Sequence, residues 1–93
     1  MGIPTANIGV VWPRIIANEG KAFKQKLGQE FTYTIKGDTI VPSTTKWNIP
    51  KSSFEKALEF VPLEKVAAIT RVCQGPSYVY AILMDQRIRN DLW

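Results

Sequence analysis

The spacing of apolar residues near the start of the chain predicts a short helix. Trp12 and Pro13 precede the run RIIANEG, residues 14–20. Proline at the first helical position and glycine just past the last one are typical of a short helix. We therefore predict a helix that begins at the proline and rests on the core through Trp12, Ile15 and Ile16.

After this helix the apolar period changes to two, which indicates strands. Aromatic and branched side chains alternate with polar ones over residues 31–36, as in a half-buried strand. Gly37 and Asp38 then form a two-residue sequence typical of the turn between antiparallel strands, and the extended pattern resumes until Pro42 limits pairing. We predict an antiparallel β-hairpin, or a three-stranded meander, at about 21–43.

Two helical patterns are expected after a polar loop over residues 43–50. Ser52 and Glu55 have the spacing of a capping box, in which each side chain bonds a backbone amide at the start of the helix. One apolar face follows and ends before Pro62; it consists of Phe54, Ala57, Leu58 and Val61. The same spacing recurs at Leu63, Val66, Ala67 and Thr70. We predict two short helices in tandem.

The run SYVYAILM, residues 77–84, fits both a helix and a strand. Its aromatic and β-branched content favours a buried strand, whereas the apolar spacing after Pro76 favours a helix that begins there. Periodicity alone does not settle so short a run. We favour the helix, because the pattern continues through Asp85 and Arg89, which are four residues apart. A strand here would lie centrally in the sheet.

These elements predict a single compact α+β domain over residues 1–93, with residues 1–8 as a loose N-terminal arm. The small antiparallel β-hairpin or meander at about 21–43 packs against two to four short helices. A chain of 93 residues, 45% of them hydrophobic, is large enough for one core. We expect most of this core to comprise Phe23, Phe31, Tyr33, Ile35, Ile40, Phe54, Leu58, Phe60, Val66, Ile69, Val79, Ile82 and Leu83.

The residue inventory excludes several kinds of chemistry. There is no histidine, which removes histidine-dependent triads and the commonest metal ligand. The single Cys73 cannot form a disulfide within the chain and is expected to be a small buried apolar residue. No phosphate-binding glycine motif and no paired carboxylates are evident. We expect a protein that is not an enzyme and that has no catalytic residues, no cofactor and no metal.

The start of the chain and its apolar runs bear on its location. The sequence MGIPTANIG has neither the basic start nor the apolar run of a signal peptide. The longest apolar run, residues 79–84, is far shorter than the roughly 20 residues that span a bilayer. We therefore expect a cytoplasmic protein that does not cross a membrane.

The charge of the chain is uneven. Twelve Lys and Arg against eight Asp and Glu give a net charge of +4, and the excess lies within residues 21–51. Lysines and hydroxyl side chains contact phosphates, and an exposed Trp47 would stack on an unpaired base. We hypothesise a small accessory protein that binds DNA or RNA through a lysine-rich hairpin and loop. The proposed site residues are Lys24, Lys26, Lys36, Lys46, Trp47 and Lys51. The simpler interpretation is that the lysines maintain solubility and that Trp47 covers the core.

Two other hypotheses stay open at this point. Three tryptophans, with Tyr78 and Tyr80, are many large rings for a small core. Because such rings are enriched at interfaces, they also fit a homodimeric protein-interaction or small-ligand-binding module that does not bind nucleic acid. A helix-turn-helix over residues 63–88 fits only in part, since Gln74 stands where a buried apolar residue is expected.

Overall fold

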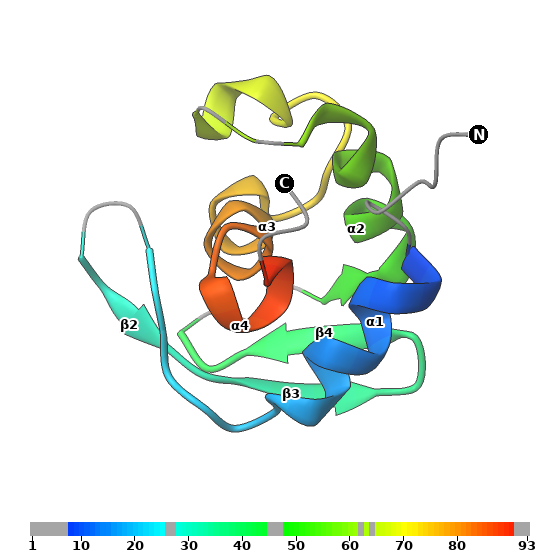
Figure 1. Ribbon diagram of the computed structural model, residues 1–93. Helices are drawn as coiled ribbons and strands as arrows, with labels where there is room; N and C mark the ends of the chain where they lie inside the picture. The colour runs from blue at the N-terminus through cyan, green and yellow to red at the C-terminus, as the bar shows by residue number, and fades with distance from the viewer. Residues whose placement is uncertain (1–7, 26–27, 45–47, 62, 64, 91–93) are drawn as a thin grey trace.

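The alternating residues after Gly28 do form strands, but they contribute to two small sheets rather than one (Figure 1). β1 (Phe23–Lys24) pairs with β2 (Glu30–Phe31), and β3 (Tyr33–Lys36) pairs with β4 (Thr39–Pro42), in both cases antiparallel. The computed structural model describes residues 8–25, 28–44, 48–61, 63 and 65–90. The predicted α+β fold, with a small antiparallel hairpin or meander packed against short helices, is confirmed.

The larger sheet has a third strand that the sequence did not indicate. β5 (Ile49–Pro50) pairs antiparallel with β4, with Ile49 opposite Ile40. Residues 49 and 50 were predicted as part of a polar loop, and this was wrong because Ile49 is fully buried and its burial draws the segment onto the sheet. The predicted turn at residues 37–38 is present, and Gly37 adopts a φ of +61°, which favours glycine.

α1 (Ile8–Ala17) begins five residues before the predicted start and contains Pro13 in its interior. The predicted arm therefore ends before Ile8; residues 1–7 lie outside the described part of the chain. Val11, Trp12 and Ile15 share one helical face and are at most 6% exposed. The free energy gained by burying these three side chains offsets the backbone hydrogen bond that is lost at a proline inside a helix.

α2 (Lys51–Ala57) continues directly from β5 and runs into the 3₁₀ helix η1 (Leu58–Phe60). The predicted capping box is wrong, because Pro50 is the N-cap residue and no side chain caps this helix. The amide of Lys51 donates to the carbonyl of Asp38 in the adjacent turn, at 2.7 Å, so the end of the strand pairing fixes where the helix starts. Pro62, the predicted end of this helix, lies outside the described residues.

The second helix predicted in tandem is absent from the described residues between Leu63 and Gly75, where the 3₁₀ helix η2 (Val66–Ala68) is found instead. Leu63 and Ile69 are the buried apolar residues of this stretch, and a separation of six does not repeat along one helical face. The helix-turn-helix hypothesis is therefore wrong, because its first helix does not form.

α3 (Pro76–Leu83) confirms the preferred helix over the run from residue 77 and excludes the strand alternative. The pattern does not continue as one helix, because α4 (Gln86–Arg89) is a separate short helix with Asp85 as its N-cap residue. The Asp85 carboxylate accepts a hydrogen bond from the amide of Arg87, at 2.9 Å. Asp85 thus starts a new helix, which ends at Arg89.

The core lies between the two sheets and the four α-helices. Ten predicted core residues are buried: Phe23, Phe31, Tyr33, Ile40, Phe54, Leu58, Ile69, Val79, Ile82 and Leu83. Ile35 and Val66 are only half-buried, and Phe60, which is 46% exposed, was placed in the core wrongly. The 3₁₀ helix at residues 58–60 turns the Phe60 side chain away from the face that Phe54 and Leu58 bury. The prediction missed Val11, Ile49, Leu63 and Ile88.

Candidate functional site

The lysines of the predicted site that the structure describes lie on three different elements. Lys24 is exposed on β1, Lys36 is exposed at the end of β3, and Lys51 is half-buried at the start of α2. The other three predicted site residues lie outside the described residues; they are Lys26, Lys46 and Trp47.

Strand register separates these lysines into two groups. Lys36 pairs with Thr39, and Thr39 pairs with Pro50, so Lys36 and Lys51 lie at the same end of the three-stranded sheet. Lys24 instead pairs with Glu30, six residues before Lys36 along the chain. An extended chain of that length spans up to about 20 Å. Lys24 therefore belongs to a different sheet from the end at which Lys36 and Lys51 lie.

Lys51 lies beside a shallow hollow at the junction of α1, α2 and the β3–β4 turn. Its ammonium group lies 5.8 Å from the centre of the Trp12 ring, a distance at which the ring face attracts a cation. The hollow has a volume of about 410 Å³, and its lining includes Asp38 and Glu55 as well as Lys51. Since two carboxylates oppose one ammonium group, the hollow is not selective for anions.

Lys24 lies on a hairpin that stands at one side of the molecule (Figure 1). The Phe23 and Phe31 side chains, on the opposite face of the hairpin, are 1% and 3% exposed. Their ring centres are 6.1 Å apart, and Phe31 makes an edge-on contact with Tyr78 of α3 at 4.9 Å. Strand alternation therefore points Lys24 away from the core.

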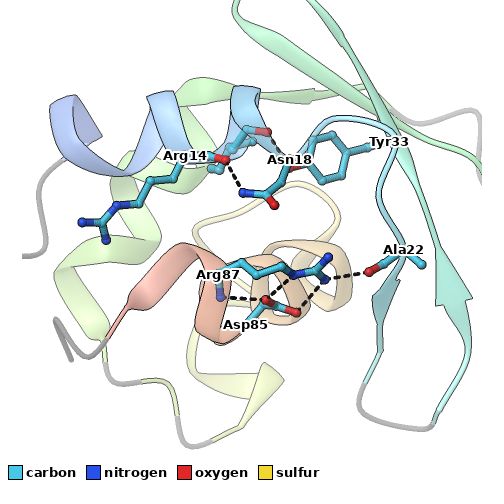
Figure 2. A network of polar contacts seen from close by, with 7 residues as sticks. Arg14, Asn18, Ala22, Tyr33, Asp85 and Arg87 are labelled. Atoms are coloured by element: carbon cyan, nitrogen blue, oxygen red, sulfur yellow. Dashed lines mark hydrogen bonds and ion pairs between the residues drawn. The ribbon is translucent and has the colours of Figure 1, made fainter.

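Arg87 of α4 attaches the base of this hairpin to the rest of the fold (Figure 2). Its guanidinium forms two hydrogen bonds of 2.9 Å to the Asp85 carboxylate and donates a third, of 2.6 Å, to the carbonyl of Ala22. It also lies over the Phe23 ring, 4.1 Å from the ring centre. The hydrogen bond from Arg87 holds the pKa of Asp85 below its usual value. The charge of Arg87 is thus already paired with a carboxylate.

A second set of polar contacts attaches α1 to its neighbours. Arg14 donates a hydrogen bond of 2.9 Å to the carbonyl of Ile88 in α4. The Asn18 side-chain amide donates to the carbonyl of Arg14 (Figure 2). The Tyr33 hydroxyl donates to the carbonyl of Ile15. Burial raises the pKa of the Tyr33 phenol above its ordinary value, so the hydroxyl remains a donor at neutral pH.

The outer face of α1 is apolar, which the sequence prediction did not anticipate. Its exposed residues are Gly9, Val10, Pro13, Ile16 and Ala17. Ile16 was predicted to rest on the core, but it is 45% exposed. The ten-residue sequence IGVVWPRIIA contains one charged residue, and a helix that is apolar on every side is the signal that identifies this face.

The remaining candidates for reactivity or metal binding are Cys73 and the carboxylates. Burial raises the pKa of the Cys73 thiol to about 11, and its sulfur donates to the carbonyl of Ser53. The thiol is therefore protonated, and a poor nucleophile, at neutral pH. Within the described ranges, no three His, Cys, Asp or Glu side chains are grouped so that they could hold a metal ion.

The last observations on this site concern membrane spans and similarity to known proteins. In the part that the structure describes, no helix is long and apolar enough to cross a membrane. The chain matches no protein-family model, no curated protein and no solved structure.

Proposed function

We propose that this chain is a small non-enzymatic accessory protein that binds nucleic acid through the β1–β2 hairpin. The observation that carries the proposal is the position of Lys24, which is exposed on a two-stranded ribbon whose aromatic rings face the core. A two-stranded ribbon is narrow enough to enter the major groove of duplex DNA. Lys36 and Lys51 lie at one end of the three-stranded sheet, and we assign them a secondary role in binding.

The charges along the hairpin support this choice. Lys21 is exposed just before β1, and Lys26 follows Lys24 by two residues in the sequence. Glu30, opposite Lys24, is the one acidic residue between residues 21 and 36. Lysines bind phosphate oxygens and release counterions from the nucleic acid, so affinity falls as the salt concentration rises.

The test measures binding of the full chain to labelled nucleic acid by fluorescence anisotropy at several salt concentrations. Duplex DNA, duplex RNA and single strands are compared. We expect the double variant Lys24→Ala, Lys26→Ala to bind more weakly and to reduce the slope of log affinity against log salt by about 2 for duplex DNA. The matched control is Lys56→Ala, Lys65→Ala, which removes two exposed lysines elsewhere. Equal effects of the two double variants would contradict a role for the hairpin.

A second candidate function is a protein-interaction module that does not bind nucleic acid. Its support is the exposed apolar face of α1, described above. The aromatic residues that first suggested such a module support it less, because Trp12 is only 6% exposed and both Tyr78 and Tyr80 are half-buried. The titration above separates the two candidates, since this module predicts no binding to any nucleic acid even at low salt.

A further inference from the structure

We infer that the outer face of α1 pairs with α1 of a second copy of this chain, in an antiparallel, two-fold symmetric arrangement. The inference rests on the second candidate function and names its partner. It starts from the two largest exposed side chains of the face, Val10 and Ile16, which are 43% and 45% exposed. Among the described residues, one other large apolar side chain is as exposed, namely Phe60 on η1.

The exposed residues of α1 form one continuous stripe. At 3.6 residues per turn, they fall within an arc of about 120°. Ile16 and Gly9 lie along one edge of this stripe, Pro13 at its centre, and Ala17 and Val10 along the other edge. None of the five side chains carries a charge or a hydrogen-bonding group. The one charged residue of the helix, Arg14, is directed to the carbonyl groups of Ile88 and Arg89.

The order of large and small side chains across the stripe makes it self-complementary. A two-fold axis that passes beside Pro13 and runs across the helix leaves each edge on its own side and reverses the helix direction. Val10 then faces Ala17 of the second copy, and Ile16 faces Gly9 of the second copy. Each of these two large side chains meets a small one along the edges of the stripe, and Pro13 meets Pro13 of the second copy at its centre.

The area of the stripe limits the strength of this pairing, and its lack of charge does not select a different partner. An uncharged stripe gives no electrostatic preference for an acidic or a basic partner. A ten-residue helix is about 15 Å long and 10 Å wide, which gives a footprint of roughly 150 Å². A stable interface buries about 800 Å² on each partner. The stripe offers about a fifth of that area, so we expect a weak dimer that forms only at high protein concentration.

The first experiment is sedimentation of the full-length chain over a wide concentration range. We expect the mass to rise from 10.5 kDa toward twice that value. Ile16→Glu and, independently, Val10→Glu place a charge on the stripe and should weaken the association at least tenfold. Phe60→Glu is the matched control, because it adds the same charge at an equally exposed apolar position outside α1. Circular dichroism checks that each variant remains folded.

A second experiment tests the antiparallel geometry. Val10→Lys alone should abolish the association, whereas the double variant Val10→Lys, Ala17→Glu should recover it at low salt, because opposite charges then face each other across the two-fold axis. A double variant that stays as monomeric as Val10→Lys would overturn this geometry.

Other outcomes would overturn self-pairing itself. Full-length protein that stays at 10.5 kDa at every concentration excludes it. Self-pairing is also excluded if the 93-residue chain is monomeric but a variant that lacks residues 1–7 dimerises, because that result would mean that residues 1–7 cover the face. The same holds if Phe60→Glu dissociates the dimer and Ile16→Glu does not. The second candidate function would then fail only if Ile16→Glu also left binding to every other protein unchanged.

Discussion

The three-stranded sheet and the β1–β2 hairpin arise from the same alternating sequence pattern, yet different interactions hold them in place. In the sheet, β3 and β4 are paired over four residues each, and β3 is covered on its other edge by Gly20 and Glu19. The Gly20 amide donates to the carbonyl of Tyr33, and the Glu19 carboxylate accepts from the amide of Ile35. β3 therefore forms hydrogen bonds along both of its edges.

The hairpin has two residue pairs, and it depends on side chains for its attachment. Its aromatic rings contact the core, and the guanidinium of Arg87 fixes its base. Segments with few backbone hydrogen bonds open locally at a lower free energy than the core does. We therefore expect the hairpin, the proposed binding element, to open at a lower free energy than the three-stranded sheet.

Loss of buried volume in the sheet should have the largest effect. Ile40 lies in the central strand β4 and is fully buried. Ile40→Ala is expected to lower the free energy of unfolding by about 2–5 kcal/mol, because it leaves a cavity between β4 and the helices. Urea denaturation monitors the change. Faster exchange of sheet and hairpin amides together is expected, and a change restricted to the hairpin would contradict the assignment of Ile40 to the common core.

Two glycines with positive φ test the same contrast. Gly75, with φ +62°, precedes α3, and a β-carbon there would lie 2.7 Å from the Cδ1 atom of the buried Ile49 side chain. Gly28, with φ +94°, lies in the hairpin turn with open space around it. We expect Gly75→Ala to cost at least about 2 kcal/mol and Gly28→Ala about 1 kcal/mol, since only the first adds a clash to backbone strain. Equal losses in chemical denaturation would show that strain alone decides both.

Removal of the guanidinium should act on the hairpin alone. Arg87→Ala deletes the ion pair to Asp85, the hydrogen bond to Ala22 and the stacking on Phe23. Since the Arg87 side chain is 38% exposed and partly screened by solvent, a loss of about 1 kcal/mol is expected. Hydrogen exchange should accelerate at the amides of Gln25 and Gly28 and much less at the amides of the three-stranded sheet. Arg71→Ala, at an exposed arginine near η2, is the control and should change neither set.

The smallest effect is expected from pH. The pKa of Asp85 is lowered in the folded state, mainly by the side-chain hydrogen bond from Arg87. A carboxyl group whose pKa is lowered by folding stabilises the fold above its unfolded pKa of about 4 and loses this contribution as the pH falls through the folded value. As the pH falls, the hairpin amides should therefore lose more protection against exchange than the amides of the three-stranded sheet lose. Asp85→Asn should remove this difference, and an unchanged pH dependence in that variant would contradict the assignment.

Local sequence signals predicted the parts of the fold that depend on local physics. The turn at residues 37–38 requires a glycine at positive φ, and the helix from Pro76 requires a proline at its start. Both preferences act within a few residues, so the sequence carries them directly. The same is true of strand alternation around Tyr33.

The remaining features depend on contacts between residues that are distant in the sequence. Pro13 lies inside α1 because Val11 and Ile15 are buried against other elements. Ile49 joins the sheet because Ile40 is available as its partner. For the candidate site, the sequence identified Lys24 as one of several lysines, but only strand register separates it from Lys36. The attachment by Arg87 spans 65 residues and has no local signal.

The hydrogen bonds from Arg14 to α4 have a consequence for the time course of synthesis. The acceptor carbonyls follow Arg14 by 74 and 75 residues. At typical translation rates, a growing chain needs about 4–15 s to add that length. During this interval α1 lacks its contacts with α4, and the part of α1 that α4 covers is open to chaperones or to neighbouring nascent chains. The first helix to be made is thus among the last to be enclosed.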